Sequence, residues 1–261
     1  MIVDNTIILG DCLEVMKQIP DKSIDLCLSD PPYGTTACEW DKVVSFNELW
    51  KEIKRVTKND FAIMTASQPF TTDLINSNRN NFKYEWIWHK NLGGGFALAK
   101  KQPLKRHENI LVFYNHQPTY NPQMEEYSDS TKKRFKQGEM VKRNTEKITN
   151  KINNGINYRG EKAIDYNTGT YPTSVKFFKR PHIANGASYH PTQKPVSLWK
   201  YLLQTYSKEG DTILDPFAGS GTTAIACHDL KRNFICIEKE PEYHAIATDR
   251  YNTHKAQLTL F

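Results

Sequence analysis

Short apolar runs alternate with segments of helical periodicity near both ends of the chain, and together they predict its regular elements. The apolar runs predict strands at 6–9, 24–29, 61–65, 83–89 and 109–114, and again at 212–215 and 234–238. The periodic segments predict helices at 12–18, 46–57, 69–77, 198–206, 222–230 and 242–251. Strands that alternate with helices indicate a mainly parallel, doubly wound α/β sheet that is covered by helices on both faces.

The segment between these two regions has a different texture, which divides the chain into parts at 1–114, 115–187 and 188–261. Residues 115–127 carry prolines and tyrosines, and residues 128–151 form a polar, lysine-rich stretch with helical potential. Asn-Gly and Asn-x-Gly turn signals follow it. We therefore expect a single sheet made from both ends of the chain, with the middle part inserted.

The strand at 24–29 leads directly into Asp30-Pro31-Pro32-Tyr33. The prolines fix φ and remove backbone donors, so the carbonyl groups here face outward as acceptors. A carboxylate, a free carbonyl and a flat ring suit an exocyclic amino group on a planar base, because the amine has two hydrogens to donate and the ring can stack. The motif indicates chemistry on a nucleobase nitrogen, provided that a reagent site exists elsewhere.

A second motif follows the strand at 212–215, where Gly219 and Gly221 allow a tight turn and a close approach to a ligand before the next helix. Glu238 ends the next strand, roughly 20 residues further on, the spacing at which an acid accepts hydrogen bonds from ribose hydroxyls. Because the turn also fits the dinucleotide fingerprint, the motif alone leaves three alternatives: a nicotinamide cofactor, another nucleoside or a plain tight turn.

In open α/β sheets, ligands bind beyond the carboxyl ends of the strands, at the point where the strand order reverses. Asp30 and Asp215 each follow or end a predicted strand. We therefore expect these two strands to be neighbours at that point, despite their separation in the sequence.

Together the motifs resemble those of the S-adenosylmethionine-dependent amino-methyltransferases, specifically the β-group DNA methyltransferases. In this group an Asp-Pro-Pro-Tyr catalytic motif comes first, a target-recognition segment follows, and a Phe-x-Gly-x-Gly cofactor motif comes last. These match 30–33 and 217–221, and a third family element, His-Pro-Thr-Gln-Lys-Pro, stands at 190–195. The resemblance covers roughly 1–115 and 188–261 and marks 1–114 as the catalytic half, 115–187 as the target-recognition region and 188–261 as the cofactor half. It implies a Rossmann-like, seven-stranded methyltransferase sheet in permuted order, with an antiparallel last hairpin.

The resemblance also implies which residues bind S-adenosylmethionine. Asp11 is similar to the family's acid that accepts from the adenine amino group of the cofactor, although an acid before a helix is more often an N-cap. Asp215 and Glu238 have capping alternatives too. The cofactor-binding candidates are Asp11, Cys12, Thr192, Lys194, Asp215, Phe217, Gly219, Ser220, Gly221, Thr222 and Glu238.

Composition narrows the class of protein. At 261 residues and 38% hydrophobic, the chain can bury one sizeable core. It has no apolar run of about 18 residues and no charged-then-apolar leader, so we expect a soluble, cytoplasmic protein that does not bind membranes. The five scattered cysteines favour reduced thiols over disulfides or zinc, and the eight histidines have no ligand-like spacing, so no metal is expected.

Positive charge is concentrated in the middle part. The whole chain carries +6, and residues 115–187 hold 13 Lys+Arg against 7 Asp+Glu, which is also +6. Clustered cations release counterions from a phosphate backbone, so the segment predicts double-stranded DNA as a partner; a solvated polar insertion is the alternative. A second basic loop, with three glycines at 93–95, separates the strands at 83–89 and 109–114, and we expect it to be mobile. The DNA-binding candidates are Lys100, Lys101, Lys105, Arg106, Lys132, Lys133, Arg134, Arg159, Lys179 and Arg180.

The motifs together predict a DNA methyltransferase that acts on adenine N6. A duplex hides this amino group, so the base must be flipped out. Tyr33 would stack on it, while the Asp30 carboxylate and the Pro31 carbonyl accept from N6 and stabilise the positive charge that develops there. Cytosine-N4 methylation is the nearest alternative, but the family's cytosine enzymes usually carry Ser in place of Asp30. RNA methylation and a non-catalytic nucleotide- or DNA-binding regulator are further alternatives. A homodimer and a cognate restriction nuclease are the partners that such enzymes suggest.

Overall fold

The structure is a computed structural model that describes residues 5–36, 38, 41–130, 169–181 and 193–258. They belong to two compact units, one of Met1–Asn121 with Thr173–Phe261 and the other of Pro122–Pro172. The first unit contains the sheet, the helices and the pocket that are described below. Five predicted ligand-binding residues lie outside the described ranges, namely Thr192, Lys132, Lys133, Arg134 and Arg159.

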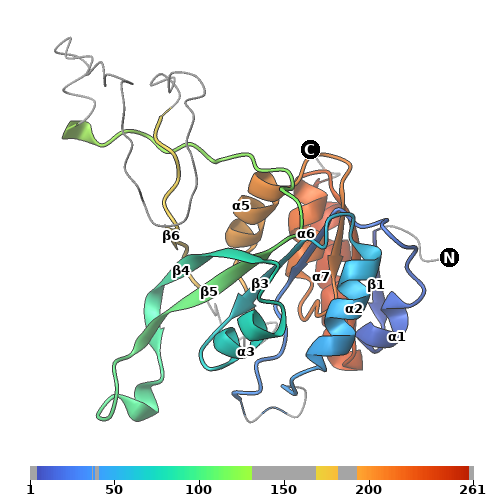
Figure 1. Cartoon of the computed structure of the whole chain (residues 1–261), viewed down its shortest axis with the longest axis horizontal. Coiled ribbons are helices and arrows are strands. Elements are labelled where there is room, and N and C mark those ends of the chain that lie inside the picture. Colours follow the sequence, from blue (N-terminus) through green and yellow to red (C-terminus); the bar gives the residue numbers. More distant parts are fainter. Residues whose placement is uncertain (1–4, 37, 39–40, 131–168, 182–192, 259–261) are drawn as a thin grey trace. The chain divides into compact units, whose positions relative to one another are not determined.

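The first unit is built on one eight-stranded sheet in the order β1-β8-β7-β2-β3-β5-β4-β6 (Figure 1). All seven predicted strands are present, and a short eighth strand, β6, adds to them. Their bounds are β1 (Thr6–Leu9), β2 (Leu26–Ser29), β3 (Ala62–Ala66), β4 (Phe82–Gly94), β5 (Lys105–Phe113), β6 (Val175–Phe177), β7 (Thr212–Asp215) and β8 (Asn233–Glu238).

The sheet is mainly parallel, as predicted. Of the described strands only β5 runs against its neighbours, β3 and β4. Strands β2 and β7 are parallel neighbours, with Leu26 opposite Ile213 and Cys27 opposite Leu214. Asp30 and Asp215 therefore lie at the carboxyl ends of adjacent strands, which confirms the predicted adjacency.

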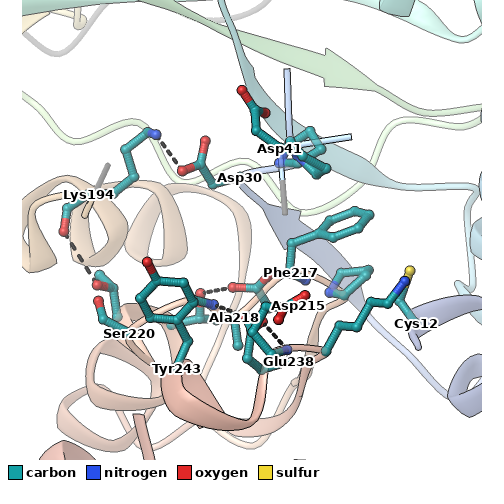
Figure 2. Close-up of a pocket in the computed structure, with 18 of the residues that line it drawn as sticks. Cys12, Asp30, Asp41, Lys194, Asp215, Phe217, Ala218, Ser220, Glu238 and Tyr243 are labelled. Atoms are coloured by element: carbon teal, nitrogen blue, oxygen red, sulfur yellow. Dashed lines mark hydrogen bonds and ion pairs between the residues drawn. The ribbon is translucent and has the colours of Figure 1, made fainter. Parts of the chain in front are cut away.

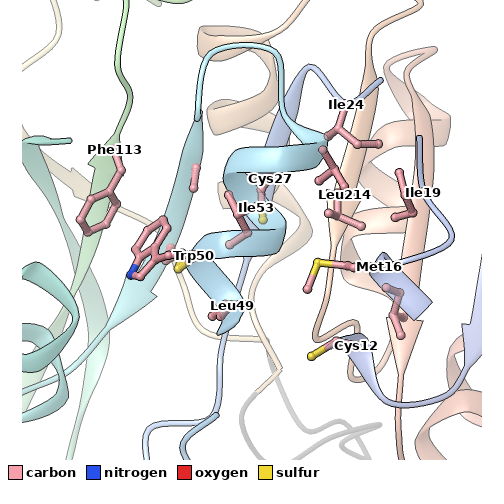
Figure 3. Close-up of a cluster of buried hydrophobic side chains, with 14 of the residues drawn as sticks. Cys12, Met16, Ile19, Ile24, Cys27, Leu49, Trp50, Ile53, Phe113 and Leu214 are labelled. Carbon is pink, nitrogen blue, oxygen red and sulfur yellow. The ribbon is translucent and has the colours of Figure 1, made fainter. Parts of the chain in front are cut away.

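Helices cover both faces of the sheet, so the doubly wound prediction is confirmed. A first core cluster joins the sheet to α1 (Cys12–Met16), α2 (Phe46–Val56) and α3 (Phe70–Ser77) (Figure 3). A second cluster joins it to α5 (Val196–Tyr206), α6 (Thr222–Asp229) and α7 (Pro241–Leu258). Neighbouring residues of β2 divide between the clusters, with Cys27 in the first and Leu28 in the second, because successive side chains of a strand point to opposite faces.

The prediction of a loop between the strands at 83–89 and 109–114 is largely wrong. Strands β4 and β5 continue into a long hairpin, with a single 3₁₀ turn, η1 (Phe96–Leu98), near its end. Gly94 pairs with Lys105 in this ladder, and a Cβ at Gly93 would lie 2.9 Å from the Cβ of Leu104. Two of the three glycines therefore serve strand pairing rather than a mobile loop.

Strand β6 lies within the segment that was predicted as an insertion. It pairs in parallel with β4 through Ile87 and Val175, and extends the sheet at that edge. The sequence gives little warning of this strand, because Val175, Lys176 and Phe177 are only three residues in a basic, aromatic stretch.

None of the helices in the described ranges is long and apolar enough to cross a bilayer. All five cysteines are free in the structure, and four of them are buried. Among the described side chains, no group of three His, Cys, Asp or Glu residues is arranged to hold a metal ion.

Candidate active site

Both sequence motifs line one pocket of about 430 Å³ in the first unit. Asp30 and Lys194 lie toward one end of it, and Asp215, Phe217 and Glu238 lie toward the other (Figure 2). We call these the Asp30 end and the Asp215 end. The pocket lies where the strand order changes, as expected for a ligand site in an open α/β sheet.

Three donors hold the carboxylate of Asp30. The hydroxyl groups of Thr65 and Tyr33 both donate to Oδ1, the latter over 2.9 Å, and the ammonium of Lys194 donates to Oδ2. Thr65 belongs to β3, the strand beside β2, so the sheet itself brings this donor to Asp30. The carboxylate is therefore fixed in orientation before any substrate arrives.

The Lys194 ammonium is nearly buried and also lies 3.4 Å from Oε2 of Glu108, on β5. Burial alone would lower the pKa of Lys194, but Asp30 and Glu108 outweigh it and hold that pKa above its ordinary value. In the same way, Lys194 and Lys90 overcome the effect of burial on Glu108 and hold its pKa below the usual range. All the charges in this cluster are thus matched by opposite charges.

Tyr33 is positioned by its ring as well as by its hydroxyl group. The ring stacks on Phe70 of α3, with centroids 5.1 Å apart and planes 29° apart. Burial raises the pKa of Tyr33 well above its ordinary value, and the negative charge of Asp30 adds to this effect. Tyr33 is therefore a neutral hydroxyl donor throughout the physiological range.

Asp41 organises the loop that follows the first motif. Its carboxylate accepts the backbone N–H groups of Gly34, Thr35 and Thr36, over 2.8, 2.9 and 2.6 Å. Gly34 has φ of +68°, which a residue with a side chain would adopt only with strain. One buried acid thus fixes the backbone beside Tyr33.

At the other end of the pocket, Asp215 is buried, and none of the lysines and arginines that the structure describes forms an ion pair with it. Its carboxylate accepts the Thr223 hydroxyl and the Phe217 N–H, the latter over 3.1 Å. Trp199 donates to the same Thr223 hydroxyl over 2.7 Å, which orients that group. Burial raises the pKa of Asp215 to about 7, and the negative charge of Asp30 adds to the rise.

Glu238 holds the glycine turn. Its Oε2 accepts the Gly219 N–H over 2.7 Å, and its Oε1 accepts the Glu240 N–H over 2.9 Å. Burial again raises the pKa, while these backbone donors partly oppose the rise. Each carboxylate oxygen can accept a further hydrogen bond, so Glu238 retains the capacity to bind hydroxyl groups.

Among the predicted cofactor residues that the structure describes, only Gly221 does not line the pocket. It precedes α6 with φ of +76°, and a Cβ there would lie 3.0 Å from Ala247 of α7. A glycine at this position therefore allows both the turn before α6 and the close packing of α7. Arg250, also on α7, supports the adjacent residue by donating to the Ser220 carbonyl over 2.8 Å.

Asp11 and Cys12 line the pocket from the start of α1. Asp11 is the N-cap of that helix, accepting the Leu13 N–H over 3.0 Å, and its Oδ2 lies 3.6 Å from Lys239. Burial, with the charge of Asp11, raises the pKa of Cys12 to about 12, so this thiol is not a nucleophile. Phe217, Gly219, Ser220 and Thr222 also line the pocket, whereas Lys194 directs its ammonium to Asp30.

The described DNA-binding candidates gather on the β4–β5–β6 edge of the sheet. Lys100 and Lys101 follow η1 and are exposed, as are Lys179 and Arg180 after β6. The Arg180 N–H donates to the Asn91 side chain over 2.9 Å, which attaches the residues after β6 to β4. Two further candidates serve the hairpin itself: the Lys105 ammonium donates to the Ser67 hydroxyl, and Arg106 donates to the carbonyls of Lys90 and Asn91.

Sequence reasoning missed Thr65, Glu108 and Asp41. Thr65 ends the strand next to the one that leads into Asp30, so the rule of adjacent carboxyl ends could have found it. Glu108 had no such signal, because it follows Lys105, Arg106 and His107 at the polar start of β5, where an acid is ordinary. Asp41 had no signal, because only the folded loop brings it to the three N–H groups.

Comparison with known proteins agrees with this geometry. Residues 24–249 match a family described as DNA methylase, of the N6 and N4 type. The type II methyltransferase M.HpaI of Haemophilus parainfluenzae is 27% identical over 96% of this chain and 75% of its own length. The DNA adenine methyltransferase YhdJ of Escherichia coli (strain K12) is 30% identical over 91% of this chain and 79% of its own length.

Solved structures share the fold. The crystal structure of an M1.HpyAVI–SAM complex has a TM-score of 0.61 at 22% identity, covering 95% of this chain and 98% of that one. The PvuII DNA methyltransferase, described as cytosine-N4-specific, has a TM-score of 0.64 at 16% identity, covering 95% and 86%.

Proposed function

The chain belongs to the N6/N4 DNA methylase family and is a DNA amino-methyltransferase, and we propose that it methylates the N6 amino group of adenine in duplex DNA, with S-adenosylmethionine as the methyl donor. The observation that carries this proposal is that one pocket joins an amine-accepting end to an anionic end. The Asp30 end offers a fixed carboxylate beside an aromatic ring, and the Asp215 end offers buried carboxylates beside a glycine turn.

The Asp215 end fits a cationic, ribose-bearing ligand. Asp215 and Glu238 have raised pKa values, and no lysine or arginine within the described part of the chain pairs with either. A ligand cation would stabilise the ionised form of these carboxylates. Glu238 also lies at the position where an acid binds ribose hydroxyls in sheets of this type. S-adenosylmethionine supplies an activated methyl group on a cationic sulfur. We assign its binding to Asp11, Cys12, Phe217, Gly219, Ser220, Thr222, Asp215 and Glu238.

At the Asp30 end, the residues of the chain grip the target base. Tyr33 offers its ring for stacking, and the Asp30 carboxylate and the Pro31 carbonyl accept the two amino hydrogens. These acceptors draw the nitrogen lone pair out of conjugation with the ring and aim it at the methyl group. As the bond from nitrogen to the methyl carbon forms, the carbon–sulfur bond would break and leave its electron pair on sulfur as a neutral thioether; the positive charge passes to the nitrogen, where the Asp30 carboxylate stabilises it. The nitrogen then loses one proton, for which Asp30 is the nearest base.

Adenine is favoured over cytosine for two reasons. The first residue of the motif is Asp30, where the family's cytosine-N4 enzymes usually carry serine. The relative described as a DNA adenine methyltransferase is 30% identical, whereas the likeness to the cytosine-N4 enzyme is one of fold, at 16% identity. Cytosine N4 remains the alternative that uses the same amino geometry.

The direct test is methylation of mixed-sequence duplex DNA by the purified protein with methyl-labelled S-adenosylmethionine, followed by nucleoside analysis. We expect label in N6-methyladenine. Label in N4-methylcytosine would replace the proposed base, and no label in DNA would contradict the activity. The matched variant, Asp30→Ala, is expected to give no label while it still binds the cofactor, and this excludes a contaminating enzyme as the source.

We further propose that the β4–β5 hairpin contacts the DNA backbone and that residues 115–187 select the target sequence. Support for the hairpin comes from exposed Lys100 and Lys101 near its end, and from exposed Lys179 and Arg180, which are attached to β4 through Asn91. Phe96, also near the end of the hairpin, is 69% exposed, and apolar side chains beside cations suit a nucleic acid groove.

A salt titration of DNA affinity tests the hairpin. Replacing Lys100 and Lys101 by glutamine should reduce the slope of log K against log salt by about 1 to 2, because each phosphate contact contributes roughly 0.9. Lys51→Gln/Lys54→Gln is the control, since it removes two exposed lysines from α2. An equal change of slope in both variants would mean that the hairpin makes no special contact.

A further inference from the structure

Glu108 has no assigned role, although it is closely tied to the Asp30 end. Its Oε1 accepts the ammonium of Lys90, and its Oε2 lies 3.4 Å from the Lys194 ammonium. Lys194 thus lies within reach of two carboxylates, Asp30 and Glu108, which come from different strands of the sheet.

The two carboxylates differ in how well they are satisfied. Asp30 accepts hydrogen bonds on both oxygens, whereas Oε2 of Glu108 is buried and accepts none within the described residues. A buried acceptor without a hydrogen bond costs about 1–3 kcal/mol, so such an atom calls for an explanation.

The position of Lys194 conflicts with the proposed reaction. Its ammonium takes one of the two lone pairs of Oδ2 of Asp30, and Oδ2 is the oxygen left for a target amine because Oδ1 already accepts Thr65 and Tyr33. Its positive charge beside Asp30 also opposes the positive charge that develops on the attacking nitrogen. The arrangement that is stable without a base is therefore unsuited to the reaction.

We propose that Lys194 is a movable counter-ion, which leaves Asp30 for Oε2 of Glu108 when the target amine binds; this rests on the proposed function. Glu108 is then a positioning residue, because it acts through Lys194 and does not touch the base. The movement keeps the charges balanced. Both before and after it, the cluster contains two carboxylates, Asp30 and Glu108, and two ammoniums, Lys194 and Lys90.

The geometry allows this movement without a change of backbone. The Thr222 hydroxyl donates to the Lys194 carbonyl over 3.4 Å, so the backbone of Lys194 is attached to the start of α6 (Figure 2). Its side chain has a flexible four-carbon stem, and the Glu108 oxygen is already 3.4 Å from the ammonium. A rotation of the side chain is enough to complete the new hydrogen bond and to release Oδ2 of Asp30.

The test compares kcat for methyl transfer to duplex DNA in a cycle of two variants. Glu108→Gln removes the charge that receives Lys194, so the lysine stays on Asp30, and we expect kcat to fall about 10- to 100-fold with the KM for the cofactor unchanged. Lys194→Met removes the competitor and should retain kcat within about tenfold of the wild type. Glu85→Gln on β4 removes a similar charge outside the pocket and should leave kcat unchanged.

The double variant is decisive. If Glu108 acts by receiving Lys194, its loss has no consequence once the lysine is absent, so Glu108→Gln/Lys194→Met should be about fivefold or more faster than Glu108→Gln alone. A purely structural role for Glu108 predicts that kcat follows the free energy of unfolding of the three variants in urea, whereas the proposal predicts the gain in kcat in fully folded protein, whichever way stability changes. A double variant no faster than Glu108→Gln overturns the proposal, whereas a wild type without methyl transfer contradicts the proposed function itself.

A second variant keeps the proposal testable if Glu108→Gln does not fold. Lys90→Met leaves Lys194 as the nearest cation to Glu108, which strengthens the pull of Glu108 on Lys194. We expect kcat equal to or above that of the wild type. A loss of about tenfold or more in folded Lys90→Met protein would overturn the proposal.

Discussion

The two ends of the pocket neutralise their carboxylates in different ways. At the Asp30 end, Asp30 and Glu108 are matched by the ammoniums of Lys194 and Lys90. At the Asp215 end, Asp215 has only hydroxyl and amide donors, and burial raises its pKa to about 7. Cations of the chain thus pair with the acids at the Asp30 end, whereas no cation among the described residues pairs with Asp215.

This difference agrees with the two ligands that we propose. A cationic cofactor supplies the charge that the Asp215 end lacks, so binding and charge balance are achieved together. A target base is neutral when it arrives and gains charge only as the reaction proceeds. The Asp30 end therefore needs a resident cation to hold it without substrate, and a place for that cation to go during the reaction.

The largest expected effect is a separation of turnover from cofactor binding. Asp30→Ala should lower kcat by about 10³ or more, because it removes the carboxylate that stabilises the developing charge, while cofactor Kd changes little. Asp215→Asn should weaken cofactor binding about tenfold or more, since it removes the carboxylate that faces the ligand cation. Calorimetry gives Kd, and single-turnover transfer at saturating cofactor gives the rate.

Each of these variants is the control for the other, because each removes one pocket carboxylate. Near-equal losses of Kd and kcat in both would mean that the two ends are not separate sites, and the comparison would fail.

The next effect concerns stability and pH. The pKa of Asp215, about 7, lies above the ordinary value of roughly 3.9, so between these pH values the folded protein holds a proton that the unfolded chain has released. The free energy of unfolding therefore falls as pH rises through this window, by a few kcal/mol at most, at about 1.4 kcal/mol per unit of pKa difference. Asparagine does not titrate, so Asp215→Asn lacks this loss of stability. In urea unfolding, the free energy of unfolding of Asp215→Asn should therefore increase relative to that of the wild type between about pH 4 and 7.

Cofactor affinity should show the opposite dependence. A cationic ligand binds the ionised form of Asp215, so wild-type affinity should rise with pH until about 7 and then level off. Glu238 also has a raised pKa, so the comparison with Asp215→Asn isolates the contribution of Asp215. The same pH dependence in both proteins would show that a different group controls binding.

The sequence predicted the parts of the site that depend on local chemistry. Asp30 to Tyr33 and the turn at Gly219 are contiguous motifs, so their residue types and spacing already indicate their ligands. The apolar runs also predicted the seven main strands and, with the rule on carboxyl ends, the adjacency of the strands beside Asp30 and Asp215.

The rest depends on contacts between distant parts of the chain. Lys194 lines the pocket, but the sequence did not show that β5 places Glu108 near Asp30 or that the two acids together hold the Lys194 ammonium. Gly221 was expected to contact the cofactor, yet the packing of α7 accounts for it. The hairpin was predicted as a loop, because consecutive glycines usually indicate the end of a strand. In the structure Gly94 instead pairs with Lys105 in the β4–β5 ladder. No local pattern reports such contacts.

The smallest effect tests the comparison with one pair of matched substitutions. Both acids accept a buried threonine hydroxyl, Thr65 at Asp30 and Thr223 at Asp215. Valine keeps the shape and removes the hydroxyl, and a hydrogen bond to a charged group contributes about 1.5–3 kcal/mol. Because Asp30 keeps the Tyr33 hydroxyl as a donor even after Lys194 leaves, Thr65→Val should lower kcat only about tenfold and leave cofactor Kd unchanged. Thr223→Val should weaken cofactor binding by a similar factor at neutral pH. It should also raise the pKa of Asp215 further, because the Thr223 hydroxyl stabilises the ionised carboxylate in the wild type. The rise appears as a shift of the pH dependence of Kd toward higher pH.

If Thr65→Val altered Kd as strongly as Thr223→Val does, the two carboxylates would belong to one coupled site rather than to two ends with different tasks.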